Sequence, residues 1–246
     1  MGQKISKNPA HRRFLFRFRS QPRGQSFVEL MLVVMFLAML LAAVVEYGFM
    51  LNQYLHVLDG AREAARYSNT SVAFTFSGTT INDKLSFYYI TAAKAATTMD
   101  PVILNPANPD DIVISDFSVT SGSLPVRFPS SDPNGWSLCH HYADFAAYFP
   151  SIGDSVPDQL SDPGWSSGCT VHTSQFTSAD IMSRIDASWP NNGILLVEIY
   201  YNYPQLLKLL SNTSFLGVNY AIIPDPIPLY VYTMMPLSSA EPTQVP

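Results

Sequence analysis

Hydrophobic residues are concentrated in one segment near the N-terminus. Residues 30–45 (LMLVVMFLAMLLAAVV) contain no polar side chain, and Ser26 to Val28 extend this segment beyond the single acid Glu29. Its length approaches the roughly 20 residues needed to cross about 30 Å of hydrocarbon. Core helices of soluble proteins seldom lack a polar face over such a length. The pattern therefore predicts a membrane-spanning helix from about Ser26 to Val45.

The helical pattern continues beyond the apolar segment. Apolar residues recur at spacings of three and four as far as Ala65, polar residues fill the other face, and no proline interrupts them. We expect one helix over residues 25–68, on the order of 60 Å long at about 1.5 Å per residue, whose second half is an amphipathic stalk. The small residues Ala61, Ala64 and Ala65 suit close packing, either against neighbouring helices or against the chain's own head.

Beyond the stalk, the pattern is typical of a small head with mixed secondary structure. Residues 82–99 place apolar side chains along one face and predict a second helix. Residues 111–120 alternate apolar with polar side chains, and residues 194–201 form a β-branched and aromatic run, so both predict strands. Residues 229–234 predict a weaker third strand. We therefore expect the α+β fold class, with an antiparallel sheet in a head over residues 69–237.

A loop-rich insertion separates these predicted strands. Residues 121–192 are rich in Ser, Pro, Asp and Gly, and they contain all three tryptophans and both cysteines. Large aromatic residues favour an ordered insertion over a disordered linker. The C-terminal residues 238–246 are expected to form a loose tail.

Charge is distributed unevenly along the chain. Residues 1–24 hold seven of the fourteen Lys and Arg residues and no acid, whereas seven basic residues face nineteen acidic ones from Gln25 onward. A basic block directly before an apolar helix places the N-terminus in the cytoplasm and the following domain outside. The acidic head disfavours nucleic acid as a partner.

A short motif stands at the cytoplasmic edge of the apolar segment. Residues 24–29 (GQSFVE) place a glycine after the basic leader and an acid five residues beyond it. This arrangement resembles type IV pilin-like proteins. With VEYG at 45–48, NQY at 52–54 and AREAARY at 61–67, residues 23–68 resemble the TadE family of pseudopilins from tight adherence (Tad/Flp) systems.

This resemblance implies a structural subunit of a pilus or of its assembly machinery, without catalytic residues or a cofactor. It implies that a prepilin peptidase cleaves after Gly24, so that residues 1–24 are a leader and Gln25 begins the mature chain. It also implies that Glu29 pairs with the α-amino group of a neighbouring subunit during assembly. The partners would be other pilin or pseudopilin subunits, the peptidase and membrane lipid, with the surface pilus as one destination. Leu30 departs from the family's signature, which usually has Phe or Tyr there.

The three acidic or aromatic residues at the ends of the apolar segment have physical interpretations of their own. An ionisable residue inside a membrane helix usually marks function, although Glu29 lies close enough to the edge to extend towards the headgroups. Glu46 and Tyr47 are expected to mark the outer membrane boundary.

Other export signals remain alternatives for the N-terminus. A secretory signal peptide has an apolar stretch of about 7 to 15 residues and a small-residue cleavage site, neither of which matches this segment. Residues 12–15 (RRFL) resemble a twin-arginine signal, a short pattern that any basic leader matches easily.

The two cysteines suggest a disulfide in the exported insertion. Oxidation of Cys139 and Cys169 would close a loop of roughly 30 residues and contribute about 3 kcal/mol. The alternative is a metal site of these two cysteines with histidines 140, 141 and 172, although adjacent ligands differ from the usual spacing of two to four. Acidic and amide residues at 132–162 are a weaker candidate for calcium.

No sequence motif supports an enzyme. The chain lacks a P-loop, G-x-G-x-x-G and H-E-x-x-H, and we predict no catalytic residue and no metal site. The alternative function is a membrane-anchored exported enzyme or ligand-binding domain that uses the Trp- and Cys-bearing insertion.

Overall fold

A computed structural model describes residues 25–77, 80–120, 123–185, 192–208, 213–215, 218–220 and 224–237. The predicted leader (1–24) and tail (238–246) lie outside these residues, as does Trp189. The chain divides into two compact units, Met1–Ala43 and Val44–Pro246.

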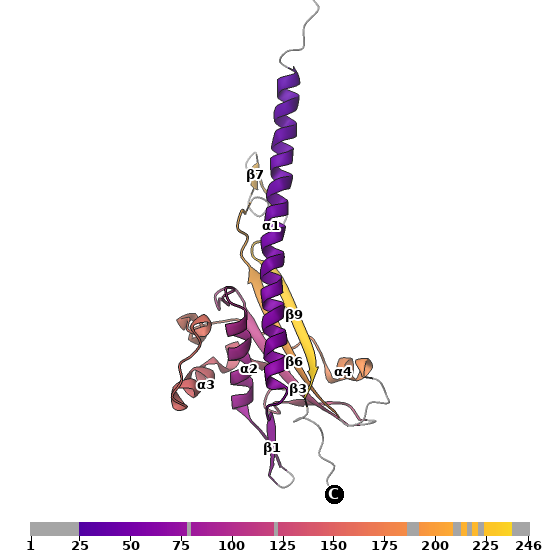
Figure 1. Cartoon of the computed structure of the whole chain (residues 1–246), viewed down its shortest axis with the longest axis vertical. Helices are drawn as coiled ribbons and strands as arrows, with labels where there is room; N and C mark the ends of the chain where they lie inside the picture. Colours follow the sequence, from indigo (N-terminus) through magenta and orange to yellow (C-terminus); the bar gives the residue numbers. More distant parts are fainter. Residues whose placement is uncertain are drawn as a thin grey trace, which may run out of the picture. The chain divides into compact units, whose positions relative to one another are not determined.

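The first helix, α1 (Gln25–Ser68), is continuous over 44 residues (Figure 1). Leu, Met and Ala favour helix, and no proline or internal capping residue ends it. Among the described residues, it is the helix that is long and apolar enough to cross a membrane, judged by length and composition. In the first unit its large apolar side chains, from Phe27 to Leu41, are all exposed.

The head is built on one antiparallel sheet with strand order β4-β3-β6-β9, in which β5 also pairs with β3. Its strands are β3 (Asp111–Val119), β4 (Val126–Phe128), β5 (Trp136–Ser137), β6 (Asn192–Tyr203) and β9 (Ile227–Pro236). Two small hairpins are formed by β1 (Phe74–Ser77) with β2 (Thr80–Asp83) and by β7 (Thr213–Phe215) with β8 (Val218–Tyr220). The sheet confirms the predicted α+β class.

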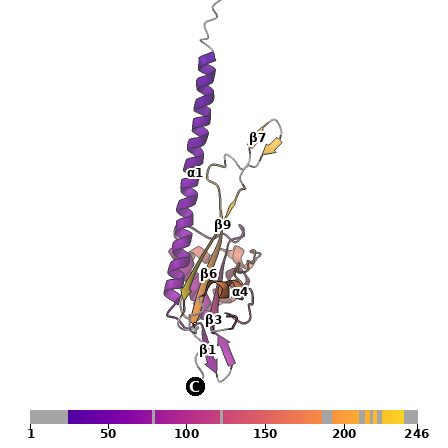
Figure 2. The same ribbon diagram turned by 90° about the vertical axis from the view of Figure 1, so that its right-hand side faces the viewer.

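Alternation along the central strands gives this sheet two apolar faces. On β6, odd-numbered residues such as Leu195 and Val197 join the larger core, which includes α1, α2 (Leu85–Thr98) and α3 (Leu138–Ser151). Even-numbered residues such as Leu196 join a smaller core on the opposite face, where α4 (Ser178–Arg184) packs. Figure 2 shows the C-terminal half of α1 along one side of β6 and β9.

The stalk half of α1 packs on the head through small residues. Ala61, Ala64 and Ala65 have no exposed surface, so this alanine face covers the chain's own head. At Gly60, α1 approaches α2 closely. A Cβ atom on Gly60 would lie 2.9 Å from the carbonyl oxygen of Ala95 in α2. The sequence allowed these alanines to pack either against neighbouring helices or against the chain's own head. In the structure they pack against the head.

The insertion contains a helix that the sequence analysis did not predict. Ser137 caps the N-terminus of α3, because its hydroxyl accepts a hydrogen bond from the amide of His140. Tyr142, Phe145 and Phe149 then bury one face of the helix. Two short 3-10 turns follow, Asp158–Leu160 and Pro163–Ser166, and the second buries Trp165.

Candidate functional site

The N-terminal end of α1 lies at the predicted processing motif. Gly24 lies outside the described residues, and Gln25 is the first residue of the helix. Glu29 follows one turn later on an exposed position, among apolar side chains that are also exposed. One acid on an apolar helix surface can act as an electrostatic contact for a cation that arrives with another helix.

The apolar half of α1 has no polar face. Its large side chains are exposed; for example, Met35 is 67% exposed and Leu37 is 63% exposed. Monomeric soluble proteins rarely expose a continuous apolar surface of more than a few hundred Å². Lipid or other apolar helices must therefore cover this segment, which fits a membrane-anchored protein.

Glu46, at the end of the apolar segment, connects the helix to the head. Its carboxylate accepts hydrogen bonds of 2.8 Å from the Tyr203 hydroxyl and from the amides of Leu206 and Leu207. The residue predicted at the membrane boundary thus also holds the turn that follows β6. Tyr47, predicted beside it at the boundary, is 61% exposed.

A second polar contact lies about two helical turns further along α1. The hydroxyl of Tyr201 donates a hydrogen bond of 2.5 Å to Oε1 of Gln53. Positions 46 and 53 share one face of the helix, and positions 201 and 203 share one face of the strand. Burial, with the Glu46 carboxylate next to it, raises the pKa of Tyr203, which therefore remains a hydrogen-bond donor.

The cysteines of the insertion form a disulfide. Cys139 and Cys169 are 30 positions apart in sequence, and their Cα atoms are 5.8 Å apart. Because both sulfur atoms are bonded to each other, the two-Cys, two-His metal site is not the observed arrangement. His172 instead lies with Nε2 at 2.9 Å from the carbonyl oxygen of Pro109.

Asp111, a fully buried residue of β3, ties both ends of the disulfide loop to the sheet. Its carboxylate accepts hydrogen bonds from the Ser137 hydroxyl and from the amides of Cys139 and His172. Burial raises the pKa of Asp111 to about 6, although these hydrogen bonds oppose the shift. Sequence reasoning missed this role, since an acid in an alternating strand is expected to face solvent.

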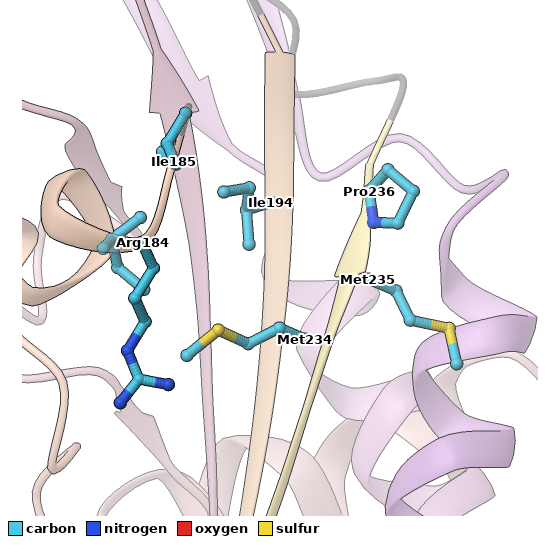
Figure 3. A pocket seen from close by; sticks show the side chains of 7 residues that line it. Arg184, Ile185, Ile194, Met234, Met235 and Pro236 are labelled. Atoms are coloured by element: carbon cyan, nitrogen blue, oxygen red, sulfur yellow. The ribbon is translucent and has the colours of Figure 1, made fainter. Parts of the chain in front are cut away.

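A small apolar cavity of about 170 Å³ lies on the α4 side of the sheet (Figure 3). It is lined by Ile181, Arg184, Ile185, Ile194, Met234, Met235 and Pro236. Figure 3 shows Met234 extending towards Arg184 and Met235 extending to the other side of β9. Arg184 is the one charged group in this lining, and its guanidinium lies 4.7 Å from the ring centre of Phe176. A lone arginine held in this way provides no acid–base pair for catalysis.

Residues 24–66 match the family model described as TadE-like protein. The N-terminal segment is TadE-like. The predicted resemblance is confirmed for this segment, and the match supports a component associated with a Tad pilus. The TadE-like family is structural and pilus-associated rather than enzymatic. No curated protein and no solved structure matches the chain.

The TadE-like segment contains the helix surfaces described above. It begins at Gly24, includes Glu29 and the rest of the apolar half, and ends within the last turns of the stalk. Glu46 and Gln53, which accept hydrogen bonds from the head, lie within the matched segment. The head after residue 66 lies outside the match.

Proposed function

We propose that this chain is a structural pseudopilin or minor pilin subunit of a Tad-type pilus or of its assembly machinery. The observation that carries the proposal is the TadE-like match, which begins at Gly24 and continues through the apolar half of α1 into the stalk. The acid and the apolar surface that a pilin-like subunit uses in assembly are both on this helix.

In the proposed sequence of events, a prepilin peptidase cleaves after Gly24 and Gln25 becomes the N-terminus. The basic leader holds the cleavage site on the cytoplasmic side, and the acidic head is outside. Glu29 then pairs with the new α-amino group of a neighbouring subunit, which sets the register between helices. The apolar surface exchanges lipid for other helices as subunits assemble.

The two halves of α1 differ in which of their surfaces remain available to other subunits. The alanine face of the stalk is committed to the chain's own head, so it is not available to neighbouring subunits. Other stalk residues remain exposed, including Phe49 (49%) and Leu55 (49%). We therefore assign contacts between subunits to the apolar half and to this exposed side of the stalk.

Deletion and complementation in the native cell test this function. Deleting the chain should abolish or reduce surface filaments, and the wild-type chain should restore them. Glu29→Ala should fail to restore filaments while the protein still accumulates in the membrane. Glu63→Ala is the matched control, because Glu63 lies on the same helix and pairs with Arg66 at 2.8 Å. Filaments that persist after deletion, together with loss of a soluble activity, would support the exported-enzyme alternative instead.

A further inference from the structure

We propose that Asp132, His140 and His141 form a binding site for one divalent transition-metal ion of the zinc type. One ligand atom from each residue lies within 4.8 Å of the other two. The three residues come from the turn before β5 and from the first turns of α3. This site is independent of the proposed pilus function.

The spacing of the ligand atoms suits a single ion. Oδ1 of Asp132 lies 3.0 Å from Nε2 of His141 and 3.6 Å from Nδ1 of His140. Zinc binds nitrogen and carboxylate oxygen at about 2.0 to 2.2 Å, so ligands of one tetrahedral ion lie roughly 3.3 Å apart. A simple His–Asp hydrogen bond accounts for the contact with His141. It does not account for the second imidazole nitrogen, which lies 3.6 Å from the same oxygen.

Neighbouring groups hold two of the three ligands in place. The hydroxyl of Ser131 donates a hydrogen bond of 2.7 Å to Oδ2 of Asp132, which leaves Oδ1 to face the histidines. The ring of His141 stacks on Trp136, with the ring centres 5.7 Å apart and the planes at 11°. Outer-shell contacts of this kind orient ligands in metal sites. The disulfide at Cys139 fixes the same turn of α3.

The ligand types select the class of metal. Two imidazole nitrogens and one carboxylate suit zinc and similar transition metals, whereas calcium and magnesium prefer oxygen ligands only. The side chains of Asp132 and His141 are 10% and 15% exposed, and that of His140 is 61% exposed. Three protein ligands would leave the fourth position of a tetrahedral ion for water, which the exposed side of the site at His140 can supply.

One electrostatic effect opposes the metal. His140 and His141 lie near the N-terminus of α3, where the helix dipole disfavours a cation. This effect is weak and screened at an exposed helix end, whereas three direct ligand bonds are strong. The ligand set therefore outweighs the dipole.

Zinc binding by the full chain tests the site. The detergent-purified protein, stripped with a chelator, is titrated with Zn²⁺ alone, and bound metal is counted after equilibrium dialysis. We expect one ion per chain, bound at micromolar concentration. Asp132→Asn, His140→Ala and His141→Phe should each weaken binding by more than about tenfold, since even loss of an outer-shell partner costs roughly 10- to 100-fold. His56→Ala, a histidine change on the stalk, should bind like the wild type.

A second measurement uses only the wild-type chain, so it does not depend on the folding of the variants. Acylation of histidines by diethyl pyrocarbonate is mapped by mass spectrometry with and without Zn²⁺. Protection of His140 and His141 but not His56 supports the site. Absence of stoichiometric zinc, unchanged binding in folded variants, or equal acylation with and without zinc would each overturn it.

Discussion

Glu46 shows how one polar residue can serve both a helix and the domain that follows it. It is the first acid after the apolar segment, and it receives three hydrogen bonds from the region that ends β6. Hydrogen bonds to charged groups contribute about 1.5 to 3 kcal/mol. This residue therefore fixes the turn after β6 to the helix more firmly than apolar contacts alone.

Glu46→Ala should release that turn. Loss of the carboxylate leaves the amides of Leu206 and Leu207 without their acceptor, so their hydrogen exchange should accelerate by roughly 10- to 100-fold, for a loss of about 1.5 to 3 kcal/mol. Amide exchange with mass spectrometry measures this. Tyr203→Phe removes a single hydrogen bond and should leave the exchange of these two amides much closer to wild type. Unchanged exchange in Glu46→Ala would show that the turn is held by other contacts.

Buried acids are a second feature at the residue scale. Burial raises the pKa of Asp116 to about 7, and its Oδ1 accepts a hydrogen bond from the Tyr88 hydroxyl. Burial also raises the pKa of Asp110 and of Asp111, each to about 6. Between about pH 4 and about pH 7, the folded head therefore holds protons that the unfolded chain has released.

The sign of the pH dependence follows from this difference. The stability that Asp110, Asp111 and Asp116 contribute is fully present below the pKa that they have in the unfolded chain. It is lost as the pH rises through the higher pKa that they have in the folded head. We expect the free energy of unfolding of the head, from denaturant titration in detergent, to be higher near about pH 5 than near about pH 7.5. Asp116→Asn should flatten this slope, whereas the exposed Asp100→Asn should not. A free energy that rises over the same range would contradict this assignment.

At the scale of elements, α1 and α2 come into close contact where they cross at Gly60. A Cβ atom on Gly60 would meet Cγ of Met99 at 2.3 Å as well as the backbone of Ala95. Further along, the hydroxyls of Ser68 and Thr91 are 2.6 Å apart, so the two helices run antiparallel. Glycine and alanine are needed here because any larger side chain separates the helices.

Gly60→Ala should destabilise the head by about 1 to 3 kcal/mol, the usual cost of overpacking. Gly48→Ala is a matched control on the same helix, because a Cβ atom there meets nothing within 4 Å. That change should be neutral or stabilising, since alanine favours helix over glycine by up to about 1 kcal/mol. Thermal unfolding of both variants measures the difference. Equal effects would mean that α1 and α2 are not in close contact.

The disulfide provides another prediction for a single element. It closes a loop of 30 positions, so Cys139→Ser with Cys169→Ser should lower the free energy of unfolding by roughly 3 kcal/mol. Wild-type protein unfolded in the presence of reductant should show the same loss, whereas reductant should not affect the double variant. Insensitivity of the wild type to reductant would mean that the bond contributes nothing to stability.

Much of the element order could be predicted from the sequence, because long periodic segments are dominated by local pattern. The strands around 111–120 and 194–201 were expected from alternation and β-branching, and β3 and β6 occupy them. Helix α3 was missed although Leu138, Tyr142, Phe145 and Phe149 have helical spacing, because the Ser, Pro and Gly around them indicated loops.

The contacts between elements could not be predicted in this way. The spacing of Ala61, Ala64 and Ala65 suits a neighbouring subunit as well as the head, and only the position of α2 distinguishes the two. The approach of Asp132 to His141 depends on the turn that ends at Gly135, whose positive φ of 95° favours glycine. Such long-range placements are properties of the folded chain rather than of local sequence.

For the whole molecule, α1 has two functions that follow from its two halves. The apolar half has no polar face and requires lipid or other helices around it. The stalk half is the part on which the head folds, through its alanine face and two hydrogen-bonding residues. The hydrogen bonds from α1 to the head described here begin at Glu46, so we expect the head to stay folded whether lipid or other helices cover the apolar half.

The N-terminus of the mature protein tests this account most directly. The intact mass and N-terminal sequence are measured for protein from cells with an active prepilin peptidase. Our account predicts a chain that begins at Gln25, and retention of the full leader in the Gly24→Ala variant or in cells that lack the peptidase. A mature chain that retains Met1, or that begins within or after residues 30–45, would contradict it.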